Sequence, residues 1–130
     1  MIILTMRTDK PESEIGLYED GNQICYETWE AHRQLAETLH KKIKELLKAE
    51  NKTLHDIGGV IAFEGPGSFT GLRIGISIAN ALAHGLDVPI VGTQGLDWIA
   101  EGAKDLMAGK NKIPVVPFYG SDANITTPKK

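Results

Sequence analysis

The sequence predicts an α/β fold in which one mixed β-sheet opens with an antiparallel hairpin and is flanked by helices. Two observations favour this fold. Short apolar runs typical of strands alternate with stretches of helical spacing, and a turn signal divides two strand-like runs near the start. The expected order is three strands followed by three helices that alternate with three more strands, joined by right-handed crossovers. A length of 130 residues fits a single domain.

The opening hairpin is predicted by its turn. Residues 1–7 form a short apolar run expected to be a buried strand, and residues 14–20 and 22–30 have the composition of two further strands. Between them lies Asp20-Gly21-Asn22, whose Asp-Gly and Gly-Asn pairs accept the positive φ values of tight turns. We therefore expect three antiparallel neighbours at the start of the sheet.

The period of the apolar residues then changes to that of a helix. Within residues 32–51, one helical stripe is formed by Leu35, Leu39, Ile43, Leu46 and Leu47. Lysines gather toward the C-terminal half of this segment, which suits the helix dipole, and Asn51 is a plausible stop. The apolar run Ile57–Phe63 that follows is expected to be a buried strand.

The remaining elements continue the alternation. Residues 72–86 are expected to form a helix closed by Gly85, residues 88–93 a strand, and residues 95–109 a helix capped by Gly109. Residues 113–120 are expected to form a last strand at the sheet edge, because two prolines interrupt its backbone donors. We assign residues 1–120 to one lobe and residues 121–130 to a polar tail.

Composition narrows the classes of function. A formal charge of −3 argues against a chain that grips nucleic acid alone, since such proteins need a basic surface. One cysteine, Cys25, allows no internal disulfide, and a reducing cytoplasmic setting fits. The apolar runs are too short to span a membrane. The four histidines have none of the spacings of a metal site, and we expect no metal.

The segment EGPGSFTGLRIG, residues 64–75, poses the main question about function. Its glycines and the absence of a following lysine do not match a P-loop, and Thr70 stands where the dinucleotide motif needs glycine. Gly65-Pro66-Gly67 instead predicts a sharp turn from strand to helix, capped by Ser68 or Thr70. A weaker anion-binding interpretation remains for the helix N-terminus, with Ser68, Thr70 and Arg73 as candidate contacts for an anion or nucleotide.

The helix after this turn has little polar surface. Gly71, Gly75 and Ala79 lie four residues apart and form a smooth stripe that another backbone could approach closely, with apolar residues on the neighbouring stripe. A helix that is apolar nearly all round is buried on both sides. One side would lie on the sheet, so the other needs a second helix or another protein. This reasoning predicts an interaction surface.

The same residues carry a resemblance to a known family. GPGSFTGLRIG, together with the preceding IGGVIAF and the following VPIVGTQGLDWIA, closely resembles the TsaB (YeaZ) family of tRNA threonylcarbamoyladenosine biosynthesis proteins. The resemblance extends over most of the chain, including the hairpin and the first helix. It implies the actin-like (ribonuclease H-like) ATPase fold without a working ATPase site.

The family's function is then expected here. The resemblance implies a non-catalytic scaffold subunit that binds the catalytic subunit TsaD or dimerises through the same face, in a complex that includes the ATPase TsaE and modifies tRNA. It implies no cofactor of its own, contact with tRNA only through the complex, no membrane, and a cytoplasmic location. The contact helices would be about Gln34–Glu50 and Thr70–Leu86. The expected interface residues are Leu35, Leu39, Ile43, Gly71, Gly75, Ile78, Ala79 and Leu82.

Two departures from the family pattern keep alternatives open. The first strand of the family ends in Asp-Thr-Ser, a remnant of a phosphate loop, where this chain has Met6-Arg7-Thr8. The sequence also ends near the start of the family's second lobe, which predicts either a natural minimal form or a truncation. The alternatives are an ATP-handling or peptidase-like enzyme of the actin-like fold, and a module that associates only with itself.

Overall fold

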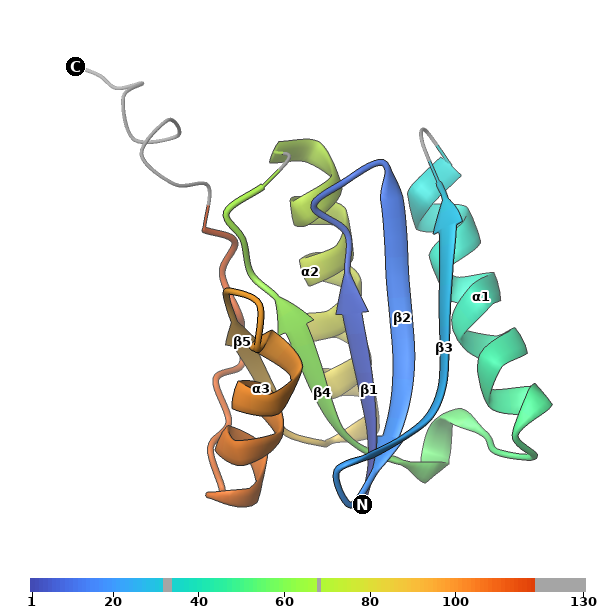
Figure 1. The fold of residues 1–130 in the computed structure, drawn as a ribbon, viewed down its shortest axis with the longest axis vertical. Coiled ribbons are helices and arrows are strands. Elements are labelled where there is room, and N and C mark those ends of the chain that lie inside the picture. Colours follow the sequence, from blue (N-terminus) through green and yellow to red (C-terminus); the bar gives the residue numbers. More distant parts are fainter. Residues whose placement is uncertain (32–33, 68, 119–130) are drawn as a thin grey trace.

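Five strands form one mixed sheet with helices on both of its faces (Figure 1). The computed structural model describes residues 1–31, 34–67 and 69–118. Across the sheet the strands follow the order β3-β2-β1-β4-β5. Their bounds are β1 Ile2–Arg7, β2 Glu12–Glu19, β3 Asn22–Glu30, β4 Ile57–Phe63 and β5 Ile90–Thr93.

The predicted hairpin is confirmed, including its turn. β1 pairs antiparallel with β2 and β2 with β3. Asp20 and Gly21 connect β2 to β3 with φ values of 52° and 83°, the two positive values that a tight two-residue turn requires. β4 and β5 join the other side of β1 in parallel, as strand–helix–strand crossovers demand.

The helices lie in two layers. α1 (Leu35–Ala49) and α2 (Phe69–Leu86) cover one face of the sheet, and α3 (Trp98–Met107) covers the other over β4 and β5 (Figure 1). A short helical turn, η2 (Leu54–Asp56), leads into β4. The α/β class with an opening hairpin and flanking helices is therefore as the sequence predicts.

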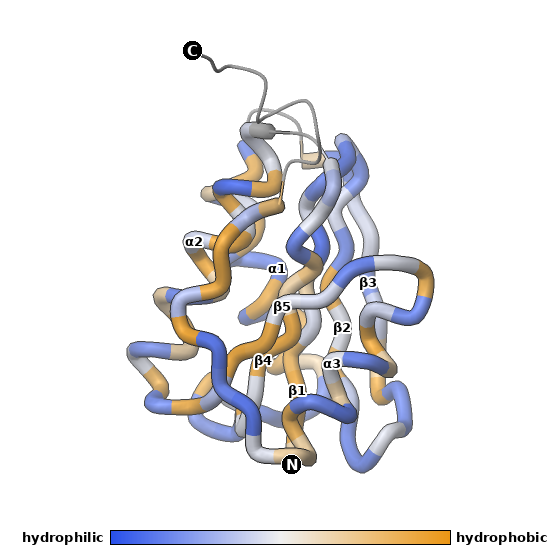
Figure 2. Tube along the Cα trace, turned by 90° about the vertical axis from the view of Figure 1, so that its left-hand side faces the viewer, coloured by the Kyte–Doolittle hydropathy of each residue, from blue (hydrophilic) through white to orange (hydrophobic). Residues whose placement is uncertain are grey.

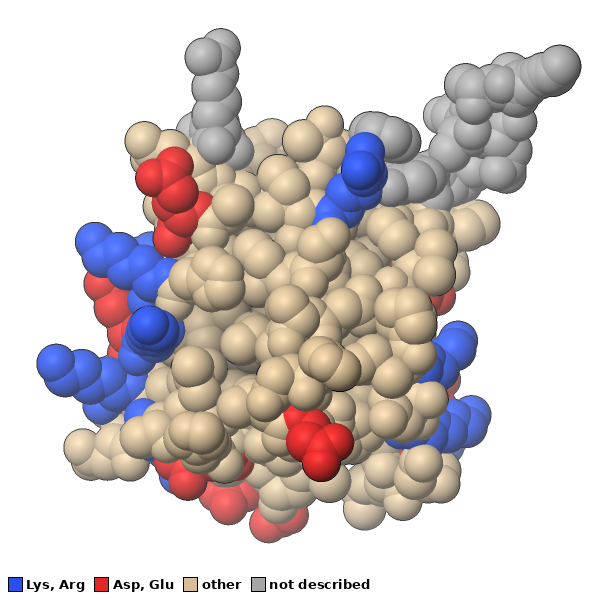
Figure 3. All heavy atoms as spheres, turned by 180° about the vertical axis from the view of Figure 1, so that it is seen from behind, with Lys and Arg blue, Asp and Glu red and all other residues tan. Residues whose placement is uncertain are grey.

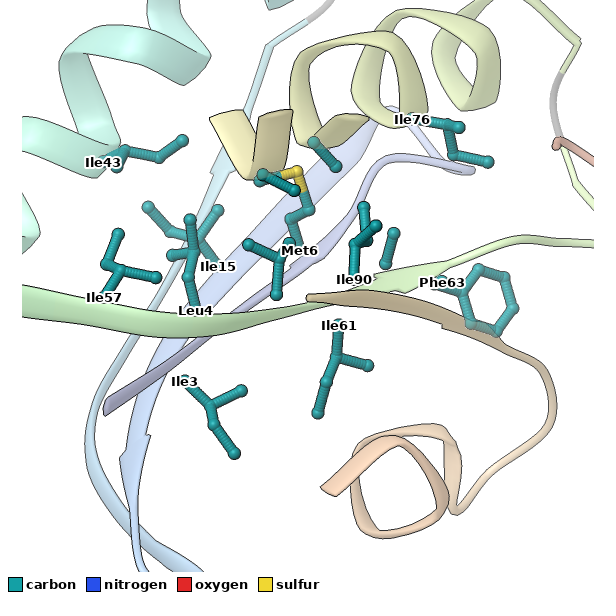
Figure 4. Close-up of a cluster of buried hydrophobic side chains, with 14 of the residues drawn as sticks. Ile3, Leu4, Met6, Ile15, Ile43, Ile57, Ile61, Phe63, Ile76 and Ile90 are labelled. Atoms are coloured by element: carbon teal, nitrogen blue, oxygen red, sulfur yellow. The ribbon is translucent and has the colours of Figure 1, made fainter. Parts of the chain in front are cut away.

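The core lies on both sides of the central strands. Figure 4 shows Leu4, Ile15 and Ile57 on the side of α1 and α2, and Ile3 and Ile61 on the side of α3. Apolar residues are concentrated in α2 and the central strands (Figure 2). Alternate residues of a strand face opposite sides, so a central strand covered on both faces reads as a continuous apolar run.

Each of the three α-helices in the described part of the chain ends in the same type of cap. A residue with positive φ follows each helix, and the next residue donates its N–H back to a carbonyl five positions earlier, as in a Schellman motif. These bonds run from Lys52 to Leu47, from Val88 to Ala83 and from Lys110 to Asp105. The residues with positive φ are Asn51, Asp87 and Gly109.

Two of these stops are predicted and one is not. Asn51 and Gly109 end their helices as expected, but the prediction that Gly85 closes α2 is wrong. The helix continues to Leu86, and Asp87 adopts the left-handed conformation at φ 57°. Aspartate tolerates this conformation better than most residues, because its short side chain bonds locally to the backbone.

The predicted last strand is also wrong over residues 113–118, which follow an irregular path beside β5 and β4. Pro114 and Pro117 lack the N–H groups that a strand ladder needs. The segment is instead fixed by α2: Asn80 donates to the Val115 carbonyl at 2.9 Å and accepts from the Val115 N–H at 2.8 Å. The predicted tail, residues 121–130, lies outside the described residues.

Candidate interaction face on α1 and α2

The glycine segment forms the turn between β4 and α2. Gly65 has φ 120°, and a Cβ added there would overlap the Phe118 carbonyl oxygen. The Phe118 N–H in turn donates to the Glu64 carbonyl at 2.6 Å. Glycine is therefore required at this turn for both its backbone conformation and its small size. Thr70 is the second residue of α2 and not its cap, while Ser68 lies outside the described residues.

The small residues of α2 face Thr8, which directly follows β1. The Thr8 hydroxyl donates to the Gly71 carbonyl at 2.8 Å. A Cβ added at Gly71 would lie 2.5 Å from the Thr8 carbonyl oxygen, and one at Gly75 would overlap the Thr8 hydroxyl. The stripe does admit a close backbone approach, as its spacing suggests. Within the chain itself, the residue that makes this approach is Thr8.

Several predicted interface residues also belong to the core. Leu35, Leu39 and Ile43 are buried between α1 and the sheet, and Ala79 is fully buried beneath α2. Their side chains therefore offer a protein partner little surface while the chain keeps this fold. The expectation that the stripe and the α1 leucines form the contact stays a prediction, although helical spacing here identifies an apolar stripe that faces the chain's own sheet.

A neighbouring stripe of α2 remains accessible. Ile74, Ile78 and Leu82 recur every fourth residue and are only partly buried. A surface hollow of about 340 Å³ lies between the two helices, lined by Ala36, Thr70, Arg73, Ile74, Ser77 and Ile78. We call the surface formed by these six residues and Leu82 the helix-pair face. Ala36, Ile74 and Ser77 were absent from the predicted interface, although the period of Ile74, Ile78 and Leu82 already marks the stripe.

The helix-pair face carries little charge. Arg73 is the only Lys, Arg, Asp or Glu residue of α2. Figure 3 shows charged residues mainly along the margins of this side of the molecule, with an uncharged surface over its middle. The candidate anion contacts Thr70 and Arg73 both line the hollow, so the structure brings these two together at the start of α2.

Arg7 and Asp9 form an ion pair at the C-terminal end of β1. Arg7 donates to both Asp9 carboxylate oxygens, at 2.7 and 3.2 Å, and its guanidinium lies 3.9 Å above the Phe63 ring centroid. Asp9 is only 8% exposed and packs against Gly67. The Arg7 charge is thus neutralised within the chain, at the stretch where the family resemblance implies a former phosphate loop.

A second polar network lies on the open face of the hairpin. The Tyr26 hydroxyl donates to Glu14 at 2.5 Å, and Lys10 lies 3.0 Å from the same carboxylate. Burial alone would raise the pKa of Glu14, but the hydrogen bond from Tyr26 and the pairing with Lys10 outweigh it and hold that pKa below its usual value. Burial of Tyr26 itself and its hydrogen bond with Glu14 raise the pKa of Tyr26.

This network predicts a pH-dependent stability difference. A folded-state pKa below the unfolded value gives stability that is present above the unfolded pKa and is lost as pH falls through the folded one. We expect Tyr26→Phe to lower the free energy of unfolding by about 1 kcal/mol at pH 7. Denaturant titrations should show the difference from wild type narrowing below about pH 4. A difference that stays constant down to pH 3 would contradict this assignment.

Two negative findings apply to the described part of the chain. Among residues 1–31, 34–67 and 69–118, no group of three or more His, Cys, Asp or Glu residues is arranged to hold a metal ion. Within the same ranges no helix has the length and apolar character needed to cross a membrane.

Known proteins resemble the chain in sequence and in fold. The family model described as TsaD, tRNA N6-adenosine threonylcarbamoyltransferase, matches residues 29–121. The tRNA threonylcarbamoyladenosine biosynthesis protein TsaB of Escherichia coli is 35% identical over 108 residues, which are 79% of this chain and 44% of that protein. The chain thus spans less than half the length of this relative.

Solved structures share the fold. YeaZ from Pseudomonas aeruginosa superposes with a TM-score of 0.68 at 24% identity, over 82% of this chain and 50% of that one. Thermus thermophilus RuvC, solved with a Holliday junction substrate, reaches 0.53 at 14% identity over 95% of this chain and 87% of that one. The sheet order and helix layers are therefore those of a ribonuclease H-like fold. With the family match over more than half of its residues, the chain belongs to the TsaD family, and within it to the TsaB (YeaZ) type.

Proposed function

We propose that the chain acts in the biosynthesis of threonylcarbamoyladenosine in tRNA as a non-catalytic subunit that binds a TsaD-type protein. The name of its Escherichia coli relative supports the pathway. In this proposal the partner supplies the catalytic residues and bound ATP. A TsaE-type ATPase completes the complex, and tRNA is contacted only within it.

The observation that carries the proposal is the helix-pair face. Ile74, Ile78 and Leu82 form a partly exposed apolar stripe with a hollow beside it, and Arg73 is the only formal charge on α2. Depletion of charge around a few apolar anchors is typical of the central part of a protein interface. The burial of the α1 leucines narrows the proposed contact to the helix-pair face.

Complex formation with a TsaD-type protein tests the proposal. We expect the two chains, mixed at micromolar concentration, to elute together from a sizing column with the light-scattering mass of one copy of each. The chain run alone at the same concentration provides the control. Separate elution would contradict the proposal. A dimer of the chain alone that does not dissociate on addition of the partner would favour the self-associating module instead.

A nucleotide-handling enzyme is the alternative from another class. The pairing of Arg7 with Asp9 weighs against it, because the guanidinium that follows the first strand is already engaged by a carboxylate of the chain. Calorimetric titration of the chain with ATP and magnesium tests this alternative. Saturable binding by the chain alone would favour the enzyme over the scaffold, and an absence of heat would leave the scaffold as the better account.

A further inference from the structure

A second hollow lies beside the helix-pair face, at the N-terminal ends of both helices. It has a volume of about 210 Å³ and shares Thr70 and Ile74 with the first hollow. Its walls come from the loop between β1 and β2, the start of α1 and the start of α2. Together with Ser13 of β2 and Ala31 after β3, these segments distant in sequence converge on one small space.

One residue that lines this hollow carries a buried hydroxyl without a partner. Ser13 lines it and is 1% exposed, yet its Oγ has no hydrogen-bond partner, the only such buried side-chain atom among the described residues. Ser13 points to the helix side of the sheet, as do Ile15 and Leu17 at alternate positions of β2. A buried polar group without a partner is costly, and such groups in native proteins call for an explanation.

Further hydrogen-bond donors meet at the same place. The first N–H groups of a helix have no acceptor within the helix, and α2, with 18 residues, presents such an end at Thr70 and Gly71. The helix dipole adds a partial positive charge there. The Thr70 hydroxyl is a third type of donor. Hydroxyls and backbone amides converging at a helix N-terminus are suited to bind an oxyanion.

The charges nearby favour a small anionic head group. Lys10 lines the hollow but also pairs with Glu14 at 3.0 Å, so its charge is shared. Glu14 follows Ser13 in the strand and therefore faces the opposite side of the sheet. Leu35 and Ile74 form an apolar wall, which fits a short aliphatic body attached to the anion.

We propose that this hollow binds the oxyanion head of a small ligand, a carboxylate or a phosphate monoester, with the Ser13 hydroxyl and the first amides of α2 as donors. The inference is independent of the proposed function, because it requires no partner protein. It also gives Ser13 a role that packing alone does not.

Titration of the complete chain with inorganic phosphate and with acetate tests the proposal. In amide NMR spectra we expect saturable shifts at Gly71 and Leu72 with at least one of the two anions, and the tighter of them identifies the head group. Ser13→Ala should weaken binding about tenfold, as expected for losing one hydrogen bond to a charged group. Thr28→Ala, which removes an exposed hydroxyl from β3, should leave binding unchanged.

Thermal melts separate this role from a structural one. Without anion, Ser13→Ala should melt at or above the wild-type temperature, because it removes a hydroxyl that has no partner. The rise in melting temperature that the anion gives to wild type should be smaller in the variant. Absence of saturable shifts with both anions, or equal affinity in wild type and Ser13→Ala, would overturn the proposal.

Discussion

Gly75→Ala is expected to lower the free energy of unfolding by about 1–3 kcal/mol, the usual cost of overpacking. Helix propensity alone would favour alanine by about 1 kcal/mol. Packing wins because the new Cβ would overlap the Thr8 hydroxyl and lie 2.8 Å from its Cβ. Thr8 cannot turn away without losing its bond to the Gly71 carbonyl. Urea unfolding monitored by circular dichroism measures the change.

Gly85→Ala is the matched control in the same helix. Gly85 is exposed, and a Cβ added there would meet no atom within 4 Å. This substitution should therefore raise the free energy of unfolding by about 0.5–1 kcal/mol through helix propensity. If Gly75→Ala proves as stabilising as Gly85→Ala, the close approach of α2 to the β1 end is wrong. A charged residue at Gly75 would likewise report on folding and not on partner binding.

The parts of the fold that the sequence predicts are those decided by local chemistry. Asp20-Gly21 specifies a tight turn wherever it occurs between strands, and Asn51 and Gly109 adopt the left-handed conformation that ends a helix. The strands β1 and β4 are recognisable because burial on both faces makes them predominantly apolar. These features depend little on distant parts of the chain.

The errors occur where distant contacts decide. Residues 113–118 have the composition of a strand, but the Asn80 side chain of α2 forms hydrogen bonds with both the N–H and the carbonyl of Val115. Gly85 has the conformational freedom to end α2, but Asp87 ends it two residues later. Neither outcome is visible in a local window, because each depends on which elements the sheet brings together.

The candidate site was only half predictable for a related reason. Low polarity predicts α2 as a helix buried on both sides, but the structure buries one side against the sheet and leaves Ile74, Ile78 and Leu82 only partly buried. Which stripe faces outward is not encoded locally, since small residues permit close approach by any backbone. Thr8 packs against Gly71 and Gly75, so Ile74, Ile78 and Leu82 lie on the outer side of the helix. Ser13 gave no sequence signal, because its unpartnered hydroxyl appears only in the folded chain.

Ile78→Glu is expected to weaken binding to a TsaD-type protein at least about 100-fold, within the range seen for central interface residues. Ile78 lines the hollow of the helix-pair face and is only partly buried in the chain. A carboxylate there would lose its water on complex formation without gaining a partner. The outer position of Ile78 should leave the fold intact, which the unchanged circular dichroism spectrum would verify.

The most direct test of the account is a calorimetric titration of a TsaD-type protein with three forms of the chain: wild type, Ile78→Glu and Leu96→Glu. Leu96 is 98% exposed beside α3, on the opposite side of the sheet, so its substitution introduces the same charge away from the helix-pair face. The account predicts tight binding by wild type and Leu96→Glu and a large loss for Ile78→Glu. Equal affinities for Ile78→Glu and wild type, or a loss confined to Leu96→Glu, would contradict it.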